Sequence, residues 1–197
     1  MTYLNLGCGP HLAPAPWINT DRNTEIYAED FSTIATRPLE RKPDVVCPSW
    51  DLPYPNESVE RVYAGHLLEH LCFADVNRTL HEIQRVLAPT GTALFVGPDM
   101  VKLAEMVFQM RASWTLFWSA HGTAGRGNPN GPAFNGRPGD VHLWNSTAEA
   151  IWFACRAAFP NRPVEIIPEE NIGPEWPLVA RVGWQAAVLV GPSYPSC

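Results

Sequence analysis

Tyr3-Leu-Asn-Leu-Gly-Cys-Gly-Pro10 is the stretch of sequence that decides the fold of this chain. Residues 3–6 form a short apolar run that is typical of a buried strand, and glycines follow it at once. A glycine turn directly after a strand lets the main chain approach a ligand closely, because no Cβ stands in the way. The third glycine of the dinucleotide fingerprint is absent, since Leu12 occupies its place. The stretch therefore predicts a strand and a ligand-binding turn without naming the ligand.

Extended and helical segments alternate beyond this opening. The expected strands are 3–6, 17–20, 45–47, 59–64, 92–96, 163–167 and 184–190. Apolar residues at helical spacing predict helices over 75–87 and 100–110, and the capping box Ser146-Thr-Ala-Glu149 opens a third that ends near Ala158. The last two strands have no helix between them, so we expect an antiparallel hairpin there. This order predicts an α/β fold with a doubly wound, mostly parallel sheet and an antiparallel C-terminal edge hairpin.

Length and composition limit the classes of protein that need to be considered. The 197 residues suit one domain, and we expect 1–197 to form a single domain. A net charge of −6, with no run of Lys or Arg, gives no support for a nucleic-acid partner. Neither a signal peptide nor a membrane span is recognisable, and the five cysteines contain no CxxC pair. The sequence thus predicts a cytoplasmic protein with free thiols that does not bind membranes.

In doubly wound sheets, ligands bind beyond the carboxyl ends of the strands. Five stretches that lie at or near these ends resemble class I S-adenosylmethionine-dependent methyltransferases, most of all the small bacterial and phage type. The resemblance covers roughly residues 3–99, in order and at the right spacing, through the segments 3–10, 17–21, 50–59, 65–71 and 82–91. It implies a Rossmann-like sheet, S-adenosylmethionine as cofactor, and methyl transfer to an acceptor that the sequence does not identify. We expect a small-molecule acceptor.

The resemblance also implies a set of cofactor contacts. The turn formed by Gly7, Cys8 and Gly9 would lie under the methionine moiety, and Asp21 would hold the ribose. Asp51 would accept a hydrogen bond from the adenine amino group, and the main chain of Leu52 would face the adenine ring. His66 would lie beside the methionine or sulfonium end of the cofactor. The family often has an acidic residue where Asn5 stands, so this chain departs from the pattern there.

The catalytic residues are not identified by the sequence. If the acceptor must lose a proton, the candidate bases are Asp99, His121, Asp140 and His142. Residues 121–140, rich in Gly, Asn and Pro, are predicted to form a lid. Because the chain begins at its first strand, we expect this lid or a second subunit of a homo-oligomer to cover the cofactor.

Two other functions compete with methyl transfer. His66-Leu-Leu-Glu-His70 matches the HxxEH pattern of inverted zinc peptidases, in which both histidines share one helix face. No third ligand stands out in the sequence, so we predict that no metal is bound. A protein with this fold that binds S-adenosylmethionine or a partner without catalysis is the other alternative, whereas the absent third glycine disfavours a nicotinamide cofactor.

Overall fold

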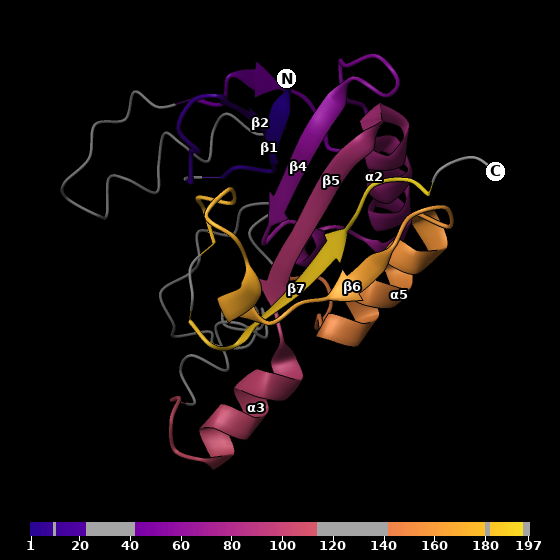
Figure 1. Cartoon of the computed structure of the whole chain (residues 1–197). Coiled ribbons are helices and arrows are strands. Elements are labelled where there is room, and N and C mark those ends of the chain that lie inside the picture. Colours follow the sequence, from indigo (N-terminus) through magenta and orange to yellow (C-terminus); the bar gives the residue numbers. More distant parts are fainter. Residues whose placement is uncertain (10, 23–41, 114–141, 180–181, 195–197) are drawn as a thin grey trace.

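A computed structural model describes residues 1–9, 11–22, 42–113, 142–179 and 182–194 (Figure 1). The described strands form one seven-stranded sheet in the order β3-β2-β1-β4-β5-β7-β6. They are β1 (Tyr3–Leu6), β2 (Trp17–Asp21), β3 (Val45–Val46), β4 (Val59–Gly65), β5 (Leu87–Pro98), β6 (Val164–Ile166) and β7 (Gln185–Val190). β1 to β5 pair in parallel, and β7 is antiparallel to both of its neighbours, β5 and β6. The predicted mostly parallel sheet with an antiparallel edge is confirmed.

Helices cover one face of this sheet. The helices of the described residues are η2 (Leu68–His70), α2 (Phe73–Val86), α3 (Met100–Phe108), α5 (Ala148–Ala158) and η3 (Glu169–Asn171). α2 and α5 lie side by side behind the strands in Figure 1, whereas α3 extends beyond the end of β5. Leu80 and Ile83 of α2 are fully buried against the sheet, and each such side chain stabilises the fold by about 1.5–3 kcal/mol.

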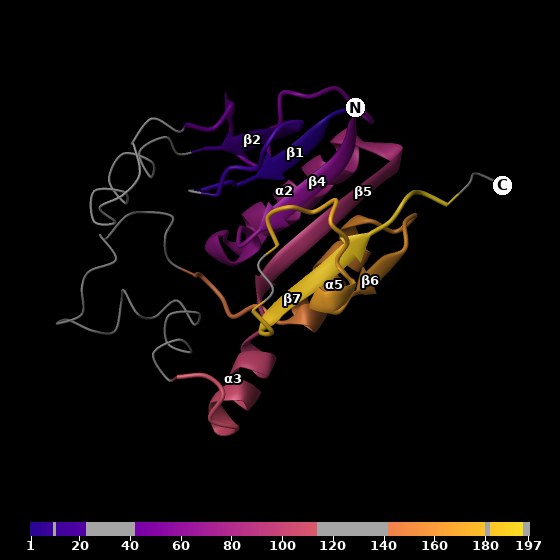
Figure 2. The same cartoon turned by 60° about the vertical axis from the view of Figure 1, so that its left-hand side comes forward.

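The connection between β6 and β7 covers part of the other face (Figure 2). Its Trp176 is buried and packs at ring-centroid distances of 5.7 Å from Trp17 and 6.5 Å from Tyr63. β1, β2 and β4 are therefore enclosed by aromatic residues on this side while their carboxyl ends remain at one edge of the sheet.

Several predicted element boundaries differ from the structure, and for the starts of β5 and α5 the structure gives the reason. β5 begins at Leu87, directly after α2, and passes through Pro89-Thr-Gly91, whereas the sequence predicted a helix as far as residue 87 and a strand only from residue 92. A register shift between Val59 and Arg61 accommodates the extra residues, and proline is tolerated at such an irregularity because no ladder hydrogen bond from its nitrogen is needed. The N-cap of α5 is Thr147, whose hydroxyl accepts from the Ala150 N–H, whereas the Ser146 hydroxyl donates to the Pro98 carbonyl.

The predicted lid at 121–140 lies outside the described residues, as do His121 and Asp140. Among the residues that are described, no helix is long and apolar enough to cross a membrane.

Candidate active site

The glycine turn after β1 forms the floor of the candidate site. Gly7 and Gly9 both have positive φ angles, +63° and +47°, which glycine adopts at little cost. A Cβ on Gly7 would lie 2.6 Å from Cδ1 of Leu67, so this glycine allows close packing against the chain that follows β4. A Cβ on Gly9 would meet no atom of the described residues within 4 Å. Among these residues the space beside Gly9 is therefore open, as a cofactor that lies on the turn requires.

Asp21, the last residue of β2, is joined to this turn. Its Oδ2 accepts a hydrogen bond from the Gly9 N–H at 3.0 Å, and its carbonyl accepts from the Cys47 N–H. The Cys8 N–H donates to the carbonyl of Thr20, which ties the turn to the end of β2, and the Cys8 side chain is buried. The structure thus brings together Gly7, Cys8, Gly9 and Asp21, four of the residues predicted to bind the cofactor.

The contacts of Asn5 require an uncharged amide at the position where the methyltransferases that the sequence resembles often have an acidic residue. Its side chain is buried, and Nδ2 donates to the carbonyl of His11 and to Oδ1 of Asn19, both at 2.8 Å. The orientation of Asn19 is fixed in turn, because its Oδ1 accepts from the Ala13 N–H and its Nδ2 donates to Asp44. A carboxylate at position 5 could make neither bond of Asn5, since an ionised carboxylate only accepts. The turn is therefore held by an uncharged amide.

The segment after β3 contains the two residues predicted to face adenine. Asp51 is exposed, and its N–H donates to the Pro48 carbonyl. The main chain of Leu52 is already bonded to α2, because its N–H donates to Glu82 at 2.7 Å and its carbonyl accepts from Arg85 at 3.1 Å. These bonds fix the position of the segment, but they also occupy the Leu52 main-chain groups that were predicted to face the ring.

The segment's anchor in α2 is an ion pair. Glu82 and Arg85 are 2.6 Å apart at their closest atoms. The hydrogen bond from Arg85 is the main reason that the pKa of Glu82 lies below its ordinary value, against the opposing effect of burial. The carboxylate that holds the Leu52 N–H is therefore ionised at neutral pH.

His66 stands at the carboxyl end of β4 with a φ of +53°. Its Nδ1 lies 3.1 Å from Oε1 of the buried Glu69, and its Nε2 lies 2.7 Å from Nε2 of Gln185. When Nδ1 carries the proton and donates to the carboxylate, Nε2 accepts from the Gln185 amide, so the ring is neutral and both nitrogens are bonded. Gln185 Oε1 is buried and has no hydrogen-bond partner among the described residues. The sequence did not single out Glu69 or Gln185 as partners of His66.

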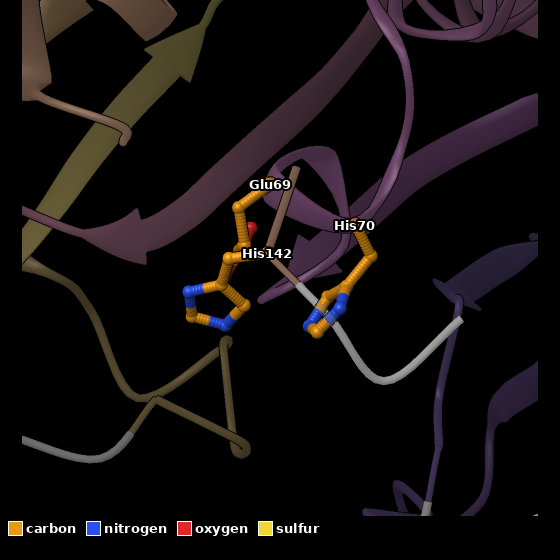
Figure 3. A group of neighbouring side chains, drawn as sticks. All are labelled: Glu69, His70 and His142. Carbon is orange, nitrogen blue, oxygen red and sulfur yellow. The ribbon is translucent and has the colours of Figure 1, made fainter. Parts of the chain in front are cut away.

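His66 and His70 do not share a helix face, so the geometry that the zinc-peptidase interpretation needs is absent. His66 precedes η2, and its ring turns toward Gln185. The ring of His70 instead packs edge-on against His142, with 4.7 Å between ring centroids. Figure 3 shows Glu69, His70 and His142 gathered beneath the end of the sheet.

Glu69 is the most deeply buried acidic residue of this region, at 1% exposure. Burial raises the pKa of its carboxyl, but the hydrogen bond with His66, the charges that His66 and His70 carry when they are protonated, and a main-chain hydrogen bond together outweigh burial, and the pKa is lowered. His11 in the glycine turn responds in the opposite way: desolvation, and then the charge of His66, lowers its pKa. The titratable groups after β1 and β4 therefore act on one another.

Asp99 has a structural role in the described chain. It is the N-cap of α3, and its buried carboxylate accepts from the N–H groups of Val101 and Lys102. Of the four candidate bases, only His142 is thus placed beside other titratable side chains within the described residues.

The fold is that of S-adenosylmethionine-dependent methyltransferases. A crystal structure of such a protein from Methanosarcina mazei superposes with a TM-score of 0.58 at 14% identity, covering 98% of this chain and 92% of that one. One from Archaeoglobus fulgidus gives a TM-score of 0.55 at 14% identity, with 96% and 85% covered. At this level of identity the likeness concerns the fold.

The sequence match is more specific. Residues 4–95 match the family model described as "Methyltransferase domain". A curated relative, "Malonyl-[acyl-carrier protein] O-methyltransferase" of Halorhodospira halophila, is 31% identical over 120 residues. The aligned region is 56% of this chain and 38% of that relative, so the chain spans well under half of the relative's length.

Proposed function

We propose that this protein transfers the sulfonium methyl group of S-adenosylmethionine to an oxygen atom of a small-molecule acceptor. The observation that carries the proposal is the open space beside Gly9, at the carboxyl edge of the sheet and next to the carboxylate of Asp21. The family match of residues 4–95 supports the same cofactor.

The residues present fit this cofactor. The turn at 7–9 leaves room where side chains would obstruct a ligand, and Asp21 lies where a carboxylate accepts ribose hydroxyls in sheets of this kind. Asp51 would accept the adenine amino group from its exposed position, held there by the bonds of Leu52 to α2. When bound, S-adenosylmethionine supplies an electrophilic methyl group with a neutral thioether as leaving group.

The chain's own contribution to transfer is alignment and exclusion of water. His66 is held from both ring nitrogens, so its ring is oriented before any ligand binds, and it would lie beside the methionine end of the cofactor. Preorganisation of this kind reduces the side-chain ordering that binding must otherwise cost.

An oxygen acceptor is supported by the relative from Halorhodospira halophila, whose name specifies O-methylation. A small molecule is supported by the net charge of −6 and the absence of basic runs, which disfavour a polyanionic acceptor.

The first test is binding. Titration calorimetry with S-adenosylmethionine and S-adenosylhomocysteine should give a single site, and NAD should give no heat. If neither sulfur ligand produces heat or a thermal shift, the cofactor assignment is refuted.

The second test is transfer. Purified protein and methyl-labelled S-adenosylmethionine are incubated with small-molecule fractions of a cell extract, and the label is followed by mass spectrometry. Oxygen acceptors are recognised because methyl esters release methanol in alkali, whereas methyl ethers yield no methanol and are located by fragmentation. Binding without transfer in any fraction would favour the non-catalytic alternative.

A further inference from the structure

A second group of side chains gathers at Glu69, and it is built by residues distant in sequence. The Leu143 N–H donates to the Glu69 carbonyl at 2.7 Å, and the indole N–H of Trp144 donates to the Leu68 carbonyl at 3.0 Å. These two bonds hold residues 142–144 against η2. His142 is thereby placed beside His70 by the main chain itself.

Glu69, His70 and His142 offer one carboxylate oxygen and two imidazole nitrogens that all lie within 4.8 Å of one another (Figure 3). Zinc bonds of about 2.0–2.2 Å separate neighbouring tetrahedral donors by about 3.3–3.5 Å. Side-chain rotations that shift the donor atoms by roughly 1–1.5 Å would therefore bring all three onto one ion. Both histidine side chains are half-buried, so an ion can reach them from solvent, whereas the carboxylate is buried.

The absence of a third ligand was the ground on which the sequence predicted no metal. The structure removes that ground, because His142 supplies the third donor from 72 residues beyond His70. The carboxylate of Glu69 can serve two partners at once, since it has two oxygens and about four lone-pair positions. Its hydrogen bond with His66 would then orient it toward the ion, as outer partners do for metal ligands generally.

We propose that Glu69, His70 and His142 form a binding site for a divalent late first-row transition metal such as zinc. Two imidazoles favour such ions over magnesium and calcium, which prefer oxygen ligands. Three protein ligands leave at least one coordination position open. The bound ion would cross-link residues 142–144 to η2 and neutralise the buried carboxylate.

The test uses the full chain without an affinity tag, stripped with a chelator and titrated with zinc against a fluorescent zinc indicator. One equivalent should bind. His70→Ala and His142→Ala should each weaken binding by at least tenfold. His81→Ala, which removes an exposed imidazole of α2, and Cys72→Ser, which removes an exposed thiol, are the matched controls and should leave the affinity unchanged.

Cobalt(II) and one further variant keep the result decisive if an alanine variant unfolds. The wild type with cobalt should show the absorption bands of a low-symmetry site, and His142→Cys should retain binding with an added thiolate-to-cobalt charge-transfer band. The proposal is overturned if wild type binds no stoichiometric zinc or cobalt, if both alanine variants bind like wild type, or if His142→Cys gives no thiolate band. None of these measurements involves S-adenosylmethionine, so failure here is distinct from failure of the proposed methyl transfer.

Discussion

A glycine at position 9 can be required for two reasons: its positive φ angle, or the space that the cofactor is proposed to occupy beside it. The variant Gly9→Ala distinguishes these two reasons. Alanine at this position meets no atom of the described residues within 4 Å, so it clashes with none of them. It must still hold a φ near +47°, a region that L-residues enter at a cost of about 1–2 kcal/mol. Part of that cost is offset, because alanine restricts the unfolded chain more than glycine does, by about 0.4–1 kcal/mol.

The net loss of stability should therefore be about 1 kcal/mol, which lowers Tm by about 2–4 °C in a chain of this size. Gly183→Ala is the matched control, since Gly183 also has a positive φ, +81°, and a Cβ on it would likewise meet none of the described atoms within 4 Å. Both variants should lose similar stability. Only Gly9→Ala places a methyl group where the cofactor is proposed to lie, and its affinity for S-adenosylhomocysteine should fall by at least tenfold, or about 1.4 kcal/mol.

The measurements are thermal unfolding for stability and titration calorimetry for affinity, with both variants in the same buffer. Equal affinities for S-adenosylhomocysteine in wild type and Gly9→Ala would refute the placement of the cofactor on this turn. A large loss of affinity in Gly183→Ala as well would show that strain, and not the occupied space, is the cause.

Three further predictions concern the groups around the turn. Asp21→Ala should weaken cofactor binding by about 1–3 kcal/mol, measured by equilibrium dialysis, because it removes a charged acceptor and its bond to Gly9. Asn5→Asp should lower the free energy of unfolding in urea by about 3 kcal/mol, since two buried donor bonds are lost and a carboxylate faces two acceptor oxygens; an unchanged midpoint would contradict the network. Glu82→Gln should flatten the acid side of the plot of unfolding free energy against pH. The pKa of Glu82 is lowered in the folded state, so the stabilisation that its carboxylate gives is present above pH 4.5 and is lost as the pH falls below that value. A variant whose unfolding free energy falls with the wild-type slope would exclude this role.

The fold was predictable because its signals are local. Each strand of the parallel part ends in a turn signal, and the apolar spacing of α2 is helical, so neither feature depends on distant contacts. The errors occurred where a distant contact decides. Ser146 has the right spacing for a cap, but it donates to Pro98, and Thr147 caps the helix instead.

The parts of the site that the sequence did not reveal depend on side chains from other elements. His66 and Glu69 have a three-residue spacing that could have suggested their bond, but Gln185 lies 119 residues from His66 and gives no local signal. Arg162 is a similar case in the core: it is buried, and its guanidinium donates to main-chain carbonyls at the start of β5 and after β7. No motif marks such a residue, because its partners are carbonyl groups that every residue has.

Glu69 connects His66 with residues 142–144. Its carboxylate is hydrogen-bonded to His66, and its main-chain carbonyl accepts from the N–H of Leu143. A displacement of residues 142–144 would therefore be transmitted to η2 and from there to the ring of His66. The buried Glu69 cannot absorb such a movement by turning into solvent, because it is 1% exposed and closely surrounded. The position of His66 is therefore linked to residues 142–144 through Glu69, and a ligand that fixes His142 is expected to restrict the ring of His66 as well.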